Sequence, residues 1–93
     1  MDGAIQEFDR ALSIDKNLAQ AYFHRGVTYI DKGDYNRAIA DYTEAIRINS
    51  NYVNAYVNRG IAYGDGKHDL DRAIADFEAA LRIDPNTPMR GNY

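Results

Sequence analysis

The residues whose types could support chemistry are few and mostly isolated. The chain has two histidines, His24 and His68, and no cysteine, which excludes thiolate and disulfide chemistry. Three aspartates, Asp65, Asp69 and Asp71, lie near His68 and suggest a cation site. A calcium-binding loop also requires a distal glutamate at a fixed position, which this segment lacks. We therefore expect no metal site, and we interpret the aspartates as helix caps.

Catalysis has equally little support. The serines Ser13 and Ser50 have no histidine at motif spacing, and no glycine-rich phosphate loop follows a strand pattern. The remaining carboxylates are spread along the chain as on a solvated helix surface. The sequence therefore predicts neither an enzyme nor a cofactor site.

Two arginines, Arg25 and Arg59, each precede a glycine, and an aspartate follows each arginine on the next predicted helix, at Asp41 and Asp76. One interpretation is an anion-binding pair of arginines, and the other is a structural ion pair. We predict an Arg–Asp pair within each unit, because the stripe beside the glycine faces the following helix.

These residues sit in segments that recur with a period of 34 residues. The segment Ala21-Tyr22-x-x-Arg25-Gly26-x-x-Tyr29 returns as Ala55-Tyr56-x-x-Arg59-Gly60-x-x-Tyr63. Apolar and small residues within each copy follow the three-and-four spacing of a helix. Repetition at this period predicts tandem helix pairs stacked as a solenoid. The glycines remove a side chain from mid-helix, which allows the next helix to approach closely.

The repeat divides the chain into a leading half unit, 2–16, and two full units, 17–50 and 51–87. We expect an all-α fold of five helices in the order B-A-B-A-B, where A and B are the two helices of a unit. Residues 88–93 do not repeat the opening of a unit, and we expect them to form a disordered tail.

Turn chemistry separates the predicted helices. Asp34 and Asp69 are expected to cap the two complete helices B, and Asn17 and Asn51 to cap the helices A. Gly33 supplies a left-handed stop. The second unit is one residue longer than the first, and we expect the turn at 64–68 to absorb the extra residue.

The pattern resembles the tetratricopeptide repeat family, with an Asn/His-Arg-Gly variant of helix A. The positions that carry the resemblance are Tyr22, Gly26, Tyr29, Ala38, Tyr42 and Ala45, their equivalents Tyr56, Gly60, Tyr63, Ala73, Phe77 and Ala80, and Pro85. Lys16 and Ser50 depart from the family's proline. The resemblance implies a short right-handed α-solenoid of helix-turn-helix repeats. It also implies a non-catalytic module whose helices A line a concave, partner-binding surface.

On that surface we expect a protein or peptide partner, in the form of an apolar or amphipathic segment. The candidate partner-binding residues are Gln20, Phe23, His24, Val27, Ile30, Asn54, Val57, Asn58 and Ile61. Phe23, Val27 and Ile30 form a second apolar stripe on a helix that already has one. Either a partner covers this stripe or the next repeat does, and we favour a partner.

One subfamily that the resemblance suggests is the carboxylate clamp, which holds acidic chaperone tails and needs Lys and Asn on the first helix A. Phe23 and Val27 occupy those places. Although Asn58 fits one clamp position, the sequence does not support chaperone-tail binding.

The alternative function is self-association. Stacked repeats need neighbours or polar caps at both ends, and this chain starts in mid-repeat, as an excised or engineered piece of a larger array would. The candidate self-association residues are Phe8, Leu12, Phe77, Leu81 and Ile83. A homo-oligomer would bury them.

Composition narrows the remaining partner classes. The chain of 93 residues has a net charge of −3 without a basic stripe, which argues against nucleic acid. No apolar run approaches the roughly 18 residues of a bilayer span. We expect a protein without membrane insertion, soluble and cytoplasmic by default.

Overall fold

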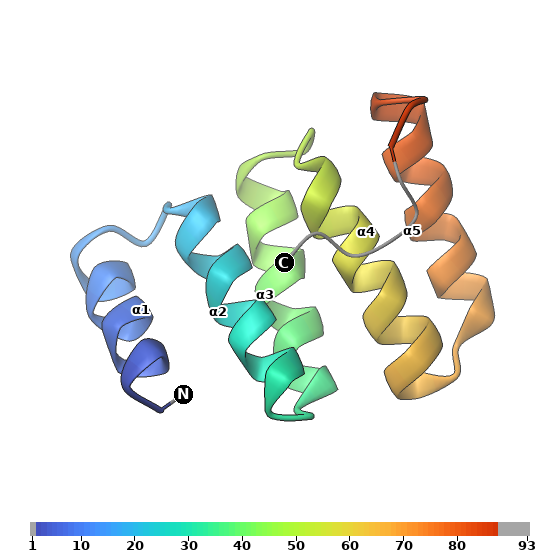
Figure 1. Cartoon of the computed structure of the whole chain (residues 1–93). Coiled ribbons are helices and arrows are strands. Elements are labelled where there is room, and N and C mark those ends of the chain that lie inside the picture. The colour runs from blue at the N-terminus through green and yellow to red at the C-terminus, as the bar shows by residue number, and fades with distance from the viewer. Residues whose placement is uncertain (1, 88–93) are drawn as a thin grey trace.

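The computed structural model describes residues 2–87, which fold as a row of antiparallel helices (Figure 1). The elements are α1 (Asp2–Ile14), α2 (Ala19–Asp31), α3 (Tyr35–Ile48), α4 (Val53–Ile61), the π-helical turn η1 (Ala62–Gly66) and α5 (Leu70–Ile83). No strand occurs in residues 2–87. The predicted all-α repeat fold with five helices is confirmed. The tail expected at 88–93 lies outside the described residues.

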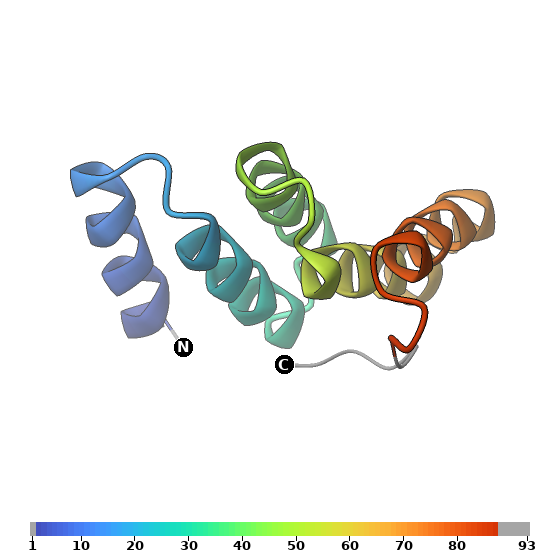
Figure 2. The same ribbon diagram turned by 90° about the horizontal axis from the view of Figure 1, so that it is seen from above.

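Each helix packs against the next along the chain, from α1 to α5. Seen from above, α2 and α4 lie toward one side of the molecule and α3 toward the other (Figure 2). The result is an elongated body measuring 34 × 24 × 17 Å. As in other helical repeat proteins, the main contacts of each helix are with its neighbours along the chain.

Two of the four predicted helix caps are confirmed. The side chains of Asp34 and Asp69 accept hydrogen bonds from the backbone N–H groups of Arg37 and Arg72, each at 3.2 Å. The same carboxylates also lie within 3.6 Å of the arginine side chains. The two complete helices B, α3 and α5, therefore begin on an aspartate that satisfies an otherwise unpaired donor.

The caps predicted for the helices A are wrong. The N-cap residues are Leu18 and Tyr52, and neither makes a side-chain cap. The backbone N–H groups of Asn17 and Asn51 bond instead to the side-chain oxygens two residues earlier. These local turns place the asparagines before the helix, so α2 and α4 begin later than expected.

The glycine positions show how closely the helices of one unit approach. A Cβ atom on Gly26 would lie 2.7 Å from a ring carbon of Tyr42, and one on Gly60 would lie 2.7 Å from the equivalent carbon of Phe77. In each unit the aromatic ring of helix B lies against the glycine of helix A. The close approach predicted from the repeated glycine is confirmed.

The extra residue of the second unit is absorbed in the π-helical turn η1, which continues α4 and includes the first residues of the segment expected to absorb it, 64–68. The end of α4 widens into η1, and His68 follows with a φ of 53°. The corresponding residue of the first unit is Gly33, with a φ of 78°. The two units thus end helix A with the same left-handed stop, but one of them uses a histidine.

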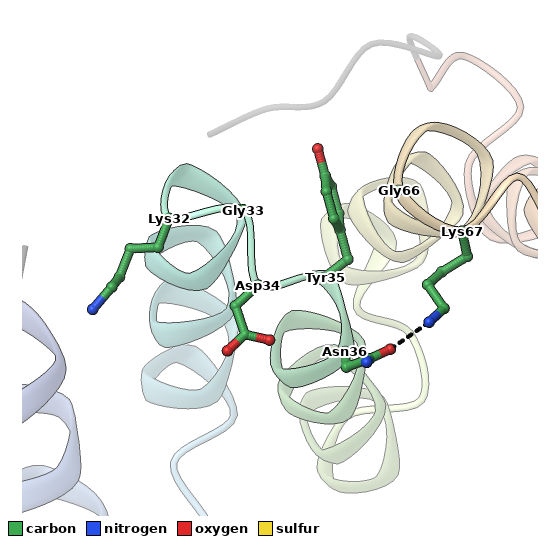
Figure 3. A pocket seen from close by; sticks show the side chains of 7 residues that line it. All are labelled: Lys32, Gly33, Asp34, Tyr35, Asn36, Gly66 and Lys67. Carbon is green, nitrogen blue, oxygen red and sulfur yellow. Dashed lines mark hydrogen bonds between the residues drawn. The ribbon is translucent and has the colours of Figure 1, made fainter.

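The π-helical turn η1 and the residue after it also join the two units. A Cβ on Gly66 would overlap the ring of Tyr35, and Lys67 Nζ donates to Asn36 Oδ1 at 2.7 Å (Figure 3). The turn therefore rests on the first residues of α3, and glycine is required where the ring passes.

Candidate functional site

The predicted ion pair of the first unit is confirmed and has an additional member. Arg25 Nε donates to Asp41 Oδ2 at 2.8 Å, and Nη2 donates to Asp41 Oδ1 at 2.7 Å. Its Nη1 donates to Asp9 Oδ1 at 2.7 Å. The hydrogen bond to Asp41 is the main cause that raises the pKa of Arg25 above its ordinary value. One guanidinium thus holds α1, α2 and α3 together.

The second unit repeats this arrangement with one change. Arg59 Nε and Nη2 donate to the two carboxylate oxygens of Asp76 at 2.9 and 2.7 Å. Its Nη1 donates to Thr43 Oγ1 at 3.1 Å, where the first unit has Asp9. The bond to Asp76 raises the pKa of Arg59 above its ordinary value.

Both guanidinium groups are therefore engaged within the fold. All three nitrogens of each arginine donate to the protein, and each group also lies over a tyrosine ring, Tyr22 or Tyr56, at 5.6 and 5.7 Å. Such bidentate, stacked arginines order the helices. This geometry supports the structural interpretation over the anion-binding one.

Part of the expected partner-binding surface is buried. Phe23 is 4% exposed and Val57 is 2% exposed. The ring of Phe23 packs against Tyr42 and Tyr52, with centroid separations of 5.7 and 5.1 Å. The expectation that these two side chains lie open is wrong, because the packing of neighbouring helices covers them.

The other expected residues remain within reach of a partner. Gln20 and His24 are exposed, and Val27, Ile30, Asn54 and Ile61 are half-buried. The ring of His24 stacks on Phe8 with a centroid separation of 6.2 Å. The surface that remains is thus narrower than predicted, with aliphatic side chains from α2 and α4 beside polar ones.

Asn58 has the most unusual environment on this surface. It is 3% exposed, and neither its amide nitrogen nor its amide oxygen has a hydrogen-bond partner among the described residues. With Ile30, Tyr42 and Ile61 it lines a small cavity of about 10 Å³. A buried amide without partners costs roughly 1–3 kcal/mol, so it calls for an explanation. Sequence reasoning included Asn58 in the surface but gave no signal of its burial.

The two ends of the chain differ in exposure. At the first end Leu12 is 7% exposed and Phe8 is half-buried, so the expectation that Leu12 lies open is wrong. Phe77 is half-buried against Gly60. Leu81 and Ile83 are 39% and 36% exposed. The outer face of α5 is therefore open, whereas α2 covers much of the corresponding face of α1.

Two of the residues first considered for metal binding, His68 and Asp69, form the turn and the cap at the start of α5. Asp69 caps α5, and His68 is the left-handed residue before it. No cluster of three or more potential metal-binding side chains occurs among the described residues. None of the helices in residues 2–87 has the length and apolar character needed to cross a bilayer.

Comparisons with known proteins cover almost the whole array. A family model described as TPR repeat matches residues 28–65, and two described as tetratricopeptide repeat match residues 7–40 and 53–87. No curated protein sequence matches the chain.

Among solved structures, the chain is similar to two entitled "Crystal structure of MamA" and "Crystal structure of MamA protein". Their TM-scores are 0.84 and 0.81, with 32% identity in both cases. Each match covers 87% of this chain but only 47% and 44% of the MamA chains. This chain thus spans less than half the length of those proteins.

Proposed function

We propose that this chain binds an apolar or amphipathic peptide across α2 and α4. The chain belongs to the tetratricopeptide repeat family and is a protein-interaction scaffold. The proposal involves no catalytic step. The bound segment would lie along Val27, Ile30 and Ile61, with Gln20, His24 and Asn54 at the edges.

The observation that carries the proposal is the unpartnered amide of Asn58. An extended peptide offers a backbone N–H and C=O that can pair with both ends of an asparagine amide. Asn58 lies next to Ile30 of one repeat and Ile61 of the next. A shift of these isoleucine side chains would open the cavity to a peptide. Binding would then satisfy the amide and cover apolar surface at the same place.

The aliphatic side chains provide a direct test. Peptides are selected against the immobilised chain from a random-sequence display library and then measured against variants. Because a buried carboxylate is costly, we expect Val27→Glu with Ile61→Glu to abolish binding. The matched control is Arg82→Glu on α5, which should bind normally, and circular dichroism checks that helicity is retained. Equal binding by the double variant would contradict the proposal.

Self-association is the alternative, and the structure weakens half of its basis. Leu12 is buried and Phe8 stacks on His24, which leaves Leu81 and Ile83 of α5 as the exposed members of the predicted self-association set. We expect light scattering to give the mass of a monomer across a concentration series. A mass that rises toward that of a dimer would favour self-association instead.

A further inference from the structure

Two exposed aspartates extend the α2–α4 surface at the carboxyl ends of its helices. Asp31 is the last residue of α2, and Asp65 lies in η1, which continues α4. The two occupy equivalent positions of the repeat, 34 residues apart. Each follows an aliphatic residue of the surface, Val27 or Ile61, by four residues, which is the spacing of neighbouring side chains on a helix. The surface therefore ends in a carboxylate on both helices.

Neither aspartate has a structural partner within residues 2–87. No hydrogen bond or ion pair joins either side chain to the described residues, whereas Asp34 and Asp69 cap α3 and α5. Both unpartnered carboxylates also lie in the last turn of their helix, where the backbone dipole disfavours negative charge. They therefore cost helix stability without an internal contact in return, which is typical of residues that act in binding.

The lysines that follow the two aspartates along the chain do not form ion pairs with them. Lys67 Nζ donates to Asn36 Oδ1 at 2.7 Å. Lys32 and Lys67 both line the hollow at the turns between helices A and B, and the Lys32 side chain points away from Lys67 (Figure 3). The two carboxylates thus remain available to a cation from a partner.

The charge on the α2–α4 surface is one-sided. The amino-terminal ends of α2 and α4 carry the uncharged side chains Gln20 and Asn54. Between the two ends lie the aliphatic side chains and the buried amide of Asn58, which has no partner among the described residues. Because α2 and α4 run in the same direction (Figure 1), the negative ends of both helix dipoles coincide with the two aspartates. A segment that crosses this surface therefore meets negative charge along one edge only.

We propose that the segment bound across α2 and α4 is a basic amphipathic peptide, with a lysine or arginine that pairs with Asp31 and Asp65. This inference rests on the proposed function and names the kind of peptide that the surface selects. Apolar side chains of the peptide cover Val27 and Ile61, and its cation lies at the carboxyl ends of the helices. The aspartates attract basic segments and repel acidic ones, so they act mainly on specificity.

The composition of selected peptides gives the first test. The random-sequence display library is selected against the immobilised chain and, in parallel, against the double variant Asp31→Asn with Asp65→Asn. We expect peptides selected on the original chain to be enriched in lysine and arginine over the starting library, and the enrichment to fall on the double variant. Peptides that bind at the α2–α4 surface without this enrichment would overturn the inference and leave the proposed function in place.

Affinity measurements on one selected peptide give the second test. The double variant should bind it roughly threefold to tenfold more weakly, because exposed charge pairs contribute modestly. Replacing the basic residue of the peptide with glutamine should weaken binding similarly, and the two changes together should add little more. Raising the NaCl concentration from about 0.05 to about 0.5 M should weaken the original complex and leave the complex without these charges nearly unchanged.

The matched control is Asp71→Asn with Glu78→Gln, which removes two exposed carboxylates from α5 and changes the net charge equally. It should bind the peptide with the affinity of the original chain. Urea denaturation should show no loss of stability in the variant Asp31→Asn with Asp65→Asn, because the helix dipoles disfavour the native charges. Weaker binding by that variant then reports on the contact and not on a disturbed fold.

Two results would overturn the inference alone. One is equal affinity of the double variant and the original chain, and the other is an equal loss in the α5 control, which would show that only overall charge matters. A library that yields no peptide sensitive to Val27→Glu with Ile61→Glu would contradict the proposed function, and this inference with it.

Discussion

At the scale of single residues, the ion pairs of Arg25 and Arg59 could be predicted from sequence because each arginine and aspartate recur together. Their third contacts could not, because Asp9 and Thr43 share a position but not a chemistry. The burial of Asn58 was also unpredictable. Its environment includes Tyr42 and Ile30, both from the previous repeat.

The Arg25 network gives a stability prediction. Asp41 is buried and accepts two bonds, so Asp41→Asn should lower the free energy of unfolding by about 2–3 kcal/mol. Asp9 is exposed, and Asp9→Asn should cost less than about 1 kcal/mol. Urea denaturation measures both variants, and equal losses would show that burial does not decide the contribution of each carboxylate.

His68 offers a stabilising substitution. It holds a left-handed conformation that a non-glycine residue adopts with difficulty. We expect His68→Gly to raise the free energy of unfolding by roughly 0.5–1 kcal/mol. The matched control is Gly33→Ala, which places a side chain in the same conformation and should lower stability by about 1 kcal/mol. A destabilised His68→Gly variant would indicate that the histidine side chain contributes to the turn.

At the scale of helices, the period and the aspartate caps predicted α3 and α5 well. The helices A were harder to predict, because the side chains of Asp15 and Asn49 accept the backbone N–H groups of Asn17 and Asn51 and form turns before α2 and α4. The stripe through Phe23 was misjudged for a non-local reason. Tyr52, which covers it, comes from the next repeat, and helical periodicity cannot show what a later segment will cover.

The packing of α4 on α5 can be tested at Gly60. Alanine is favoured over glycine in a helix by about 1 kcal/mol, yet Gly60→Ala would place a methyl group against Phe77. We expect a net loss of roughly 1–3 kcal/mol from overpacking. Gly3 has nothing within 4 Å of a Cβ, so Gly3→Ala should be neutral or stabilising. Thermal denaturation distinguishes the two, and a gain at Gly60 would contradict the close approach.

At the scale of the whole molecule, the array combines different chemistries on one surface. The α2–α4 surface is aliphatic with a buried amide, and Asp31 and Asp65 make one edge of it acidic. The repeat alone predicted that such a surface exists. It could not show which residues were accessible, because that depends on how each repeat covers the one before it.

The central claim is that a peptide pairs with Asn58 between α2 and α4. The most direct measurement is the NMR signal of the Asn58 side-chain amide during titration with a selected peptide. We expect this signal to shift on binding as the amide gains partners, and Asn58→Ala to weaken binding about tenfold or more. A peptide that binds without moving this signal, and that binds Asn58→Ala equally well, would contradict the account.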